Sequence, residues 1–454
     1  MKDRVDILNL EWSSYPSRDR QMVTLVCNYL RYMGYSVIEE SIFNGYHYIK
    51  KYKPRLYFNA SPLGAIVNTH MMKYARQKNI LGVSLISEGN FKPGKKYIDQ
   101  FLWGWNKEKD KHENIHMQWT ERTRDMSLKY YPELKEKLKV SGGVGFDIYK
   151  IGKHKDKDDF LRKYDKTNFK KIIGIGCWDF GSFYPEDERY KINVKRLTQE
   201  NINRFRKDGV EFNNILNKII SENKNILFLL KQHPGTRLGK KASAIVGTEK
   251  FENTITVKNE EAVADCINVS DFWLIYESTT AIESWLLGKQ TCLLNPSGTD
   301  FLRDEIYKGS PNFSTDKKLQ EAINSFYSSG IIPGFKDLEK NRKNIIKDVI
   351  QWDDGLNHVR AGNEIINLIE NNKITKIKKE NINYLKKRYW QMIKWYFSPY
   401  LRFLPRVKQY YHRHRIKFDY DGLKKLTEKR MKEQIEFYNK KGLDKSSLKK
   451  LKCI

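Results

Sequence analysis

The sequence predicts an α/β protein with two doubly wound, parallel-sheet domains and a basic helical tail at its C-terminal end. Short apolar runs of strand length alternate with segments whose apolar residues recur at helical spacing. This alternation starts near residue 5 and starts again near residue 171, after a charged, glycine-poor stretch. At 454 residues the chain is long enough for two domains and a tail.

The first domain is expected to span residues 1–150. No G-x-G-x-x-G sequence follows its first strand, so a dinucleotide-binding fingerprint is absent there. The glycine-rich stretch 140–147 closes the domain. The other predicted elements are strands at 5–10, 35–38, 55–58 and 80–86 and a helix at 22–33 that stops at Gly34.

A charged linker at residues 151–170 leads to the second domain, which we expect to span residues 171–371. A loop at 178–183 follows its first strand, and a helix at 361–369 closes it. The other predicted elements are strands at 171–177, 225–230, 272–276 and 291–295 and helices at 193–222, 260–269 and 281–287.

A strand, a polar turn and a helix between residues 272 and 287 predict a binding site for an anion. The free N–H groups and the positive dipole end of a helix N-terminus favour a negatively charged ligand. In a doubly wound sheet the ends of the strands 225–230 and 272–276 share one ligand-binding edge. We therefore expect Lys231 and His233 to face one phosphorylated ligand together with Ser278 and Thr279.

A K-x-H-P sequence begins at Lys231. About 40 residues later come Asp271, a hydroxyl pair, Glu283 and a Gly-Lys pair. This order of residues resembles bacterial surface-polysaccharide transferases of the GT-B type. Their relatives include the CDP-glycerol glycerophosphotransferases of teichoic acid synthesis and the Kdo and sialic acid transferases that use CMP-sugars. The resemblance is strongest over residues 165–300. These families usually carry a tyrosine and two serines at the turn, whereas here Glu277 follows Tyr276, which leaves the donor open.

The resemblance implies a GT-B fold in which two Rossmann-like domains face a cleft. The second domain would bind the donor, with Glu283 on the ribose and the loop 178–183 beside it. The first domain would present the acceptor. It carries a match to an E-W…R-D-like element of these families at Glu11-Trp12 and Arg18-Asp19.

Deprotonating an acceptor hydroxyl requires a carboxylate or a histidine in the acceptor domain. Glu88, at the end of the strand 80–86, is the candidate base, with Glu11 and Asp19 as rivals. Each candidate has a structural alternative: a surface loop carboxylate for Glu88, a turn residue for His233, a surface arginine for Arg18, helix caps for the hydroxyls and a solvated helix residue for Glu283. The predicted site residues are Glu88 and His233 for catalysis; Lys231, His233, Ser278, Thr279, Thr280, Glu283, Gly181 and Ser182 for the donor; and Glu11, Arg18 and Asp19 for the acceptor.

No metal or cofactor is expected, because the sequence lacks the patterns that would hold one. Its D-x-D sequence at Asp156 lies in the charged linker, and neither H-E-x-x-H nor a cysteine cluster occurs. No G-x-S-x-G elbow supports a serine hydrolase. The five cysteines are scattered, which suits a reducing cytoplasm.

The tail, residues 372–454, is strongly basic. It carries 25 Lys and Arg against 7 Asp and Glu, a net charge of +18 out of +29 for the chain. Aromatic and basic residues mix at 389–397, 400–405 and 410–415, as a bilayer interface favours. No apolar run approaches the roughly 18 to 20 residues of a membrane span, and no signal peptide is evident. We expect peripheral attachment to the inner face of the cytoplasmic membrane; the alternative is a charged helix packed on the body.

The prediction for function is a metal-independent glycosyltransferase, inverting if displacement is direct. It would move a sugar from a CMP-, CDP- or UDP-linked donor to a hydroxyl of a surface glycan or its lipid-linked precursor. Three alternatives stay open: a glycerophosphotransferase-type polymerase or primase that uses CDP-glycerol, an isomerase like the UDP-sugar 2-epimerases, and a non-enzymatic nucleic-acid-binding protein. The last lacks any RRM, KH or zinc-knuckle signature, so no nucleic acid is expected as a partner.

Overall fold

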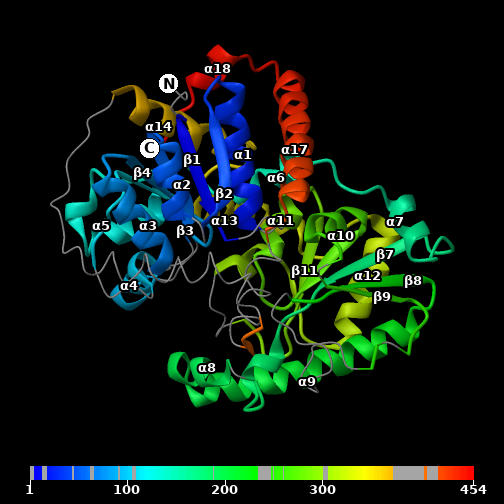
Figure 1. The fold of residues 1–454 in the computed structure, drawn as a ribbon. Coiled ribbons are helices and arrows are strands. Elements are labelled where there is room, and N and C mark those ends of the chain that lie inside the picture. The colour runs from blue at the N-terminus through cyan, green and yellow to red at the C-terminus, as the bar shows by residue number, and fades with distance from the viewer. Residues whose placement is uncertain are drawn as a thin grey trace. The chain divides into compact units, whose positions relative to one another are not determined.

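A computed structural model describes the chain except residues 1–4, 13–17, 43–44, 62–65, 90–92, 105–108, 188, 234–246, 249, 259, 300–304, 372–402 and 406–417. The chain forms two compact units (Figure 1). Unit 1 comprises Met1–Gly152 and Lys347–Ile454, and unit 2 comprises Lys153–Ile346.

Unit 1 contains a six-stranded parallel sheet in the order β2-β1-β3-β4-β5-β6. The chain runs from β1 to β2 on one side and then returns to β3 on the other side of β1, so the sheet is doubly wound. Every residue of β1 and β4 is buried, because helices cover both faces of a parallel sheet. The strands are β1 Ile7–Glu11, β2 Val37–Ser41, β3 Leu56–Ser61, β4 Leu81–Ile86, β5 Ile115–Gln118 and β6 Leu138–Val140.

Unit 2 repeats this plan in the order β12-β11-β10-β7-β8-β9. The chain crosses from β7 to β8 and β9 and returns to β10 on the other side of β7. The strands are β7 Lys171–Gly176, β8 Ile226–Lys231, β9 Thr254–Val257, β10 Phe272–Ile275, β11 Gln290–Leu294 and β12 Asn312–Phe313. The predicted α/β class with two doubly wound parallel sheets is confirmed.

The helices connect the strands and cover the sheets. Those of unit 1 before the linker are α1 Arg18–Tyr32, α2 Gly45–Tyr52, α3 Ile66–Gln77, α4 Lys95–Trp103, α5 Glu121–Leu128 and α6 Ile148–Ile151. Those of unit 2 are α7 Lys157–Lys163, α8 Tyr190–Arg196, α9 Gln199–Glu222, α10 Val263–Val269, α11 Thr280–Leu286 and α12 Asp316–Ser329. The later helices are α13 Glu339–Ile350, α14 Asn357–Asn371, α17 Tyr420–Lys440 and α18 Lys445–Lys449.

The helix α14 belongs to the core of unit 1, although the sequence-based division placed it in the second domain. Its side chains Val359 and Ile365 are fully buried in a cluster that also holds Val26 and Tyr29 of α1. A Cβ atom at Gly362 would lie 2.3 Å from a ring carbon of Tyr29, so the two helices touch at this glycine. The predicted domain end at residue 371 is therefore wrong, because α14 packs on α1 rather than on unit 2.

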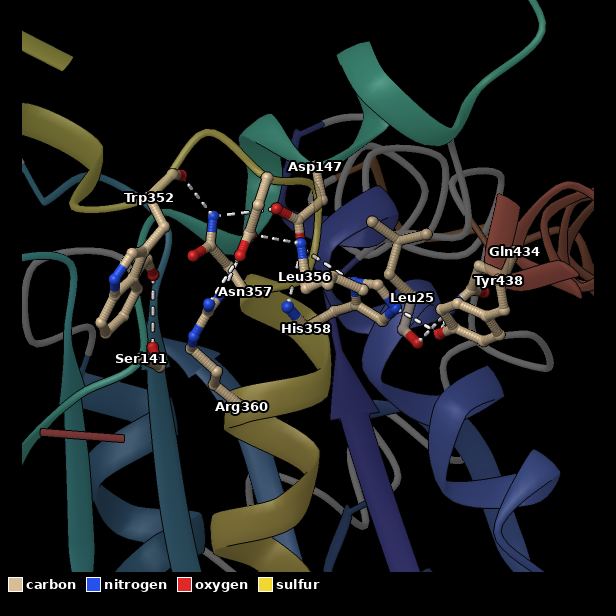
Figure 2. A network of polar contacts seen from close by, with 12 residues as sticks. Leu25, Ser141, Asp147, Trp352, Leu356, Asn357, His358, Arg360, Gln434 and Tyr438 are labelled. Carbon is tan, nitrogen blue, oxygen red and sulfur yellow. Dashed lines mark hydrogen bonds and ion pairs between the residues drawn. The ribbon is translucent and has the colours of Figure 1, made fainter. Parts of the chain in front are cut away.

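A buried polar network holds the C-terminal helix α17 on unit 1 (Figure 2). Asp147 accepts hydrogen bonds from Asn357 Nδ2 at 2.8 Å and from the backbone N–H of His358 at 2.7 Å. The same carboxylate lies 2.8 Å from His358 Nδ1, and the other ring nitrogen of His358 pairs with the hydroxyl of Tyr438 on α17. Each of these side chains is buried, so the hydrogen bonds among them pair polar groups that lie away from the protein surface.

The described part of the predicted tail, residues 403–405 and 418–454, includes the expected helical structure in α17 and α18. The helix α17 lies beside α1 (Figure 1). The aromatic clusters at 389–397 and 410–415, and residues 400–402, lie outside the described residues. Across the part of the chain that the structure describes, no helix is long and apolar enough to cross a membrane.

Candidate functional site

A pocket of about 180 Å³ opens at the carboxyl edge of the unit 2 sheet. The strand order reverses between β7 and β10, and the crevice at such a reversal is where open α/β sheets bind ligands. Segments that follow β7, β8 and β10 all contribute to the pocket wall. The lining residues are Trp178, His233, Ile275, Glu277, Ser278, Thr279, Leu293, Ile306 and Tyr307.

The turn after β10 supplies the polar floor of this pocket. Ser278 Oγ accepts hydrogen bonds from the backbone N–H of Thr280 at 3.2 Å and from its hydroxyl at 3.1 Å. The hydroxyl of Thr280 in turn accepts from Trp273 Nε1 at 3.1 Å, so it is directed into the protein. Thr279 makes no capping bond with its side chain, although it occupies the N-cap position of α11. Its hydroxyl therefore lines the pocket without a capping role.

Tyr276 holds this turn on the core of unit 2. Its ring packs against Phe180 and Phe212 in the unit 2 core, and its hydroxyl donates to Asp208 Oδ2 of α9 at 2.5 Å. Burial raises the pKa of Asp208, an effect that hydrogen bonds from Ser297 and Tyr276 oppose. Because Tyr276 immediately precedes Glu277 and Ser278, this buried bond fixes where the polar floor begins.

His233 forms the opposite side of the pocket, at the end of β8. Its side chain is 47% exposed, and its Nδ1 atom lies 3.8 Å from Asp179 Oδ2. The ring centroids of His233 and Trp178 are 6.4 Å apart. An imidazole, two hydroxyls and a carboxylate thus share one pocket with the aromatic side chains of Trp178 and Tyr307.

The structure brings together three of the predicted donor residues, His233, Ser278 and Thr279, and leaves the others outside the pocket lining. The ammonium group of Lys231 donates to the carbonyl of Lys258, and burial lowers its pKa. Thr280 is directed inward, and Glu283 is 1% exposed, so it is not the solvated helix residue of the alternative interpretation.

The loop after β7 contributes through its first residue rather than through the predicted ones. Trp178 lines the pocket, whereas Gly181 and Ser182 lie in the 3₁₀ turn Phe180–Phe183 outside its lining. The hydroxyl of Ser182 donates to the carbonyl of Asp179 at 2.9 Å. Its role in this structure is to shape the loop.

The predicted acceptor residues all belong to unit 1. Glu88 is exposed just after β4, and Asp19 is half-buried in α1. The side chain of Arg18 lies outside the described residues. Glu11 is buried at the end of β1, where its carboxyl group accepts from the backbone N–H of Ala60 at 2.7 Å. Burial raises the pKa of Glu11 to about 8, against the opposing effect of Arg20.

Several lining residues were not among the predicted site residues. Glu277 was noted only as a departure from the resembled pattern, although it directly precedes the two hydroxyls. Ile306 and Tyr307 come from the 3₁₀ turn Glu305–Gly309, where the sequence has no clear periodicity. Leu293 and Ile275 were recognised as strand residues, and only the sheet topology shows that they reach the pocket.

No group of three or more His, Cys, Asp or Glu side chains that could hold a metal ion occurs among the described residues. All five cysteines are free, and four of them are buried. Burial raises the thiol pKa of Cys177, which directly precedes Trp178. The thiol is therefore protonated at neutral pH and behaves as a small apolar side chain.

No protein-family model matches the sequence, and no curated protein matches it. Solved structures share its fold. A UDP-N-acetylglucosamine 2-epimerase has a TM-score of 0.52, covering 84% of this chain and 100% of its own at 12% identity. The S. aureus MnaA–UDP structure has a TM-score of 0.50, covering 83% and 100% at 11% identity. The wall teichoic acid polymerase TagF with CDPG has a TM-score of 0.50, covering 82% and 91% at 12% identity. At these identities the similarity concerns the fold: the chain has the two-domain α/β architecture of GT-B proteins.

Proposed function

We propose that this protein is an enzyme whose unit 2 pocket binds the nucleotide diphosphate or monophosphate end of an activated substrate. The observation that carries the proposal is the pocket itself, where His233, Ser278 and Thr279 meet at the strand-order reversal. Its volume of about 180 Å³ is below the roughly 300–1,000 Å³ that encloses a whole drug-sized ligand. The pocket is therefore suited to one part of a nucleotide substrate.

The side chains around the pocket suit the separate parts of such a ligand. The hydroxyls of Ser278 and Thr279 can donate hydrogen bonds to phosphate oxygens, and a protonated His233 adds a positive charge. The carboxylate of Glu277 can only accept, so it suits a sugar or ribose hydroxyl rather than a phosphate. The rings of Trp178 and Tyr307 offer apolar surface for the faces of a base or sugar.

The preferred reaction is transfer of a sugar to an acceptor hydroxyl. The bond between the anomeric carbon and the phosphate oxygen breaks as the acceptor oxygen bonds to that carbon, and the nucleotide leaves with the negative charge. His233 and the two hydroxyls stabilise this charge without a metal ion. Attack from the opposite face inverts the anomeric configuration, and a carboxylate takes the hydroxyl proton of the acceptor; Glu88, which is exposed just after β4, is the candidate.

Two other reactions fit the same pocket. Isomerisation of a UDP-sugar also needs a nucleotide site, and a solved UDP-N-acetylglucosamine 2-epimerase shares this fold. A CDP-glycerol transferase would place phosphorus rather than carbon at the reacting position, and TagF shares the fold as well. An assay without acceptor separates these activities, because only an isomerase converts the sugar nucleotide when no acceptor is present.

Calorimetric titration with CMP, CDP, UDP, dTDP, GDP and ADP, without added metal, tests the nucleotide site. We expect one pyrimidine nucleotide to bind and His233→Ala to weaken its binding at least tenfold, since a charged hydrogen bond contributes about 1.5–3 kcal/mol. His47→Ala is the matched control, because His47 is exposed on α2 of unit 1. Binding of none of the six nucleotides, or equal binding by both variants and the unaltered protein, would overturn the proposal.

We also propose that the protein attaches peripherally to the inner face of the cytoplasmic membrane. The basic aromatic composition of residues 372–454 supports this, and α17 exposes Lys424, Lys425, Lys429, Lys432 and Lys440. Sedimentation with anionic vesicles, but not with neutral ones, and release by salt are the expected results. Absence of sedimentation with anionic vesicles at low salt would refute the attachment.

A further inference from the structure

Two carboxylates and one guanidinium form a compact charged cluster beside the pocket. Arg189 donates from Nε and Nη2 to Asp187, at 2.9 and 2.6 Å, and from Nη1 to Asp179. Asp187 also accepts the backbone N–H of Arg189 at 2.9 Å. Both aspartates are buried, and their bonds to Arg189, first that of Asp187, raise the pKa of the guanidinium. Arg189 thus stays charged and holds the two aspartates together.

Asp179 connects this cluster to His233. The same Oδ2 atom of Asp179 that pairs with Arg189 lies 3.8 Å from Nδ1 of His233. A buried carboxylate favours a nearby cation, so this position of Asp179 favours the protonated form of His233.

We propose that Asp179 is a positioning residue for His233: it orients the imidazole and holds it in the charged form that a phosphate-bearing ligand needs. The inference rests on the proposed function of the pocket, because His233 lines that pocket and Asp179 does not. Asp179 acts through His233, and Arg189 acts by fixing Asp179. Asp179 and Arg189 therefore contribute to the site although they do not line the pocket.

The other groups around His233 allow this assignment. Glu277 on the β10 turn and Tyr307 line the same pocket, and Trp178 packs near the ring without a charge. Arg189 opposes protonation of His233, while Asp179 and Glu277 favour it. Since the His233 side chain is half exposed, solvent screens these effects.

The first experiment is an NMR titration of the His233 ring in the full-length protein without ligand, with His233→Ala to assign its signal. We expect Asp179→Asn to lower the pH midpoint by about half to one unit. Asp179→Glu, which keeps the charge, should stay near the unaltered midpoint. Asp187→Asn is the comparison: it loosens Arg189 but leaves the carboxylate beside His233, so its effect on the midpoint should be smaller than that of Asp179→Asn.

The second experiment measures affinity for the bound nucleotide from pH 5.5 to 8.5. Asp179→Asn should bind several-fold more weakly at pH 7.5 and nearly normally at pH 5.5, where His233 is protonated without help. A merely structural defect would weaken binding equally at all pH values. Melting curves of Asp179→Asn and Asp179→Glu identify a variant that fails to fold. The variant that folds then tests whether the charge of Asp179 matters for binding.

An unchanged midpoint in Asp179→Asn, or an equal shift in Asp187→Asn, would overturn the proposal. The ligand-free titration decides the relation between Asp179 and His233 even if no nucleotide binds. Absence of binding by the unaltered protein would instead refute the proposed function. The two failures are thus distinguishable.

Discussion

The hydroxyl of Tyr276 donates a 2.5 Å hydrogen bond to Oδ2 of Asp208, and both residues are fully buried. The bond joins the residue that follows β10 to α9, and its two residues lie 68 positions apart in the sequence. It also holds the residue that immediately precedes the polar floor of the pocket. The geometry of the pocket therefore depends on a contact that lies beneath it.

Tyr276→Phe should destabilise the protein by about 1–3 kcal/mol, because it removes a partner from a buried carboxyl group. Urea unfolding measures the loss. In a double-mutant cycle, adding Asp208→Ala to Tyr276→Phe should cost less than Asp208→Ala costs alone, since both variants remove the same bond. Strictly additive losses would show that the two side chains do not interact.

Glu11→Gln should make stability less dependent on pH. The pKa of Glu11 rises from its ordinary 4.5 to about 8 on burial, so between these values the folded protein binds one more proton than the unfolded chain. The free energy of unfolding then falls as pH rises, by about 1.4 kcal/mol per pH unit for this group.

Glutamine carries no titrating proton, so the difference in unfolding free energy between Glu11→Gln and the unaltered protein should grow in favour of the variant from pH 5 to 8. Glu88→Gln is the control, because Glu88 is an exposed glutamate of the same unit. A Glu11→Gln curve parallel to that of the unaltered protein would contradict the buried, proton-binding state of Glu11.

Tyr438→Phe should loosen α17. The variant removes the hydroxyl that pairs with Nε2 of His358, and this nitrogen then stays buried without that partner, at a cost of about 1–3 kcal/mol. Amide exchange along α17 should accelerate. Tyr420→Phe on the same helix is the control, since the hydroxyl of Tyr420 bonds Glu40 at the surface and should matter little. Equal acceleration of amide exchange by both variants would contradict the role of the buried network in holding α17.

Thr279→Val and Thr280→Val should separate binding from stability. Thr279 lines the pocket, so its variant should bind the nucleotide roughly two- to tenfold more weakly and keep its stability. Thr280 bonds Trp273 inside the protein, so its variant should lose about 1 kcal/mol of stability and keep more of its affinity. Calorimetry measures the affinity and urea unfolding measures the stability. Weaker binding by Thr280→Val together with lower stability of Thr279→Val would contradict the assignment of Thr279 to the pocket.

Much of the fold was predictable because parallel strands that are buried on both faces have largely apolar sequences. The runs at 7–11, 226–231 and 272–275 are strands in the structure, and the carboxyl edge that the last two share brings His233 together with Ser278 and Thr279. This much follows from topology alone.

The rest depended on contacts that no local pattern encodes. Lys231 leaves the pocket because the carbonyl of Lys258 is within its reach, and Thr280 turns inward because Trp273 offers an indole N–H. The docking of α14 on α1 joins residues more than 300 positions apart, as in the hydrogen bond from Tyr29 to Asn363. Only the folded chain reveals such pairs.

The divided sequence of unit 1 has a consequence for the order in which the protein matures on the ribosome. All residues of unit 2 precede α14 and α17 in the chain, and domains generally fold as units during synthesis. Unit 1 begins earlier but waits for α14 and then α17, so the buried side of α1 stays open while the middle of the chain is translated. Residues 5–152 of unit 1 are thus made before unit 2, although the unit to which they belong is completed after it.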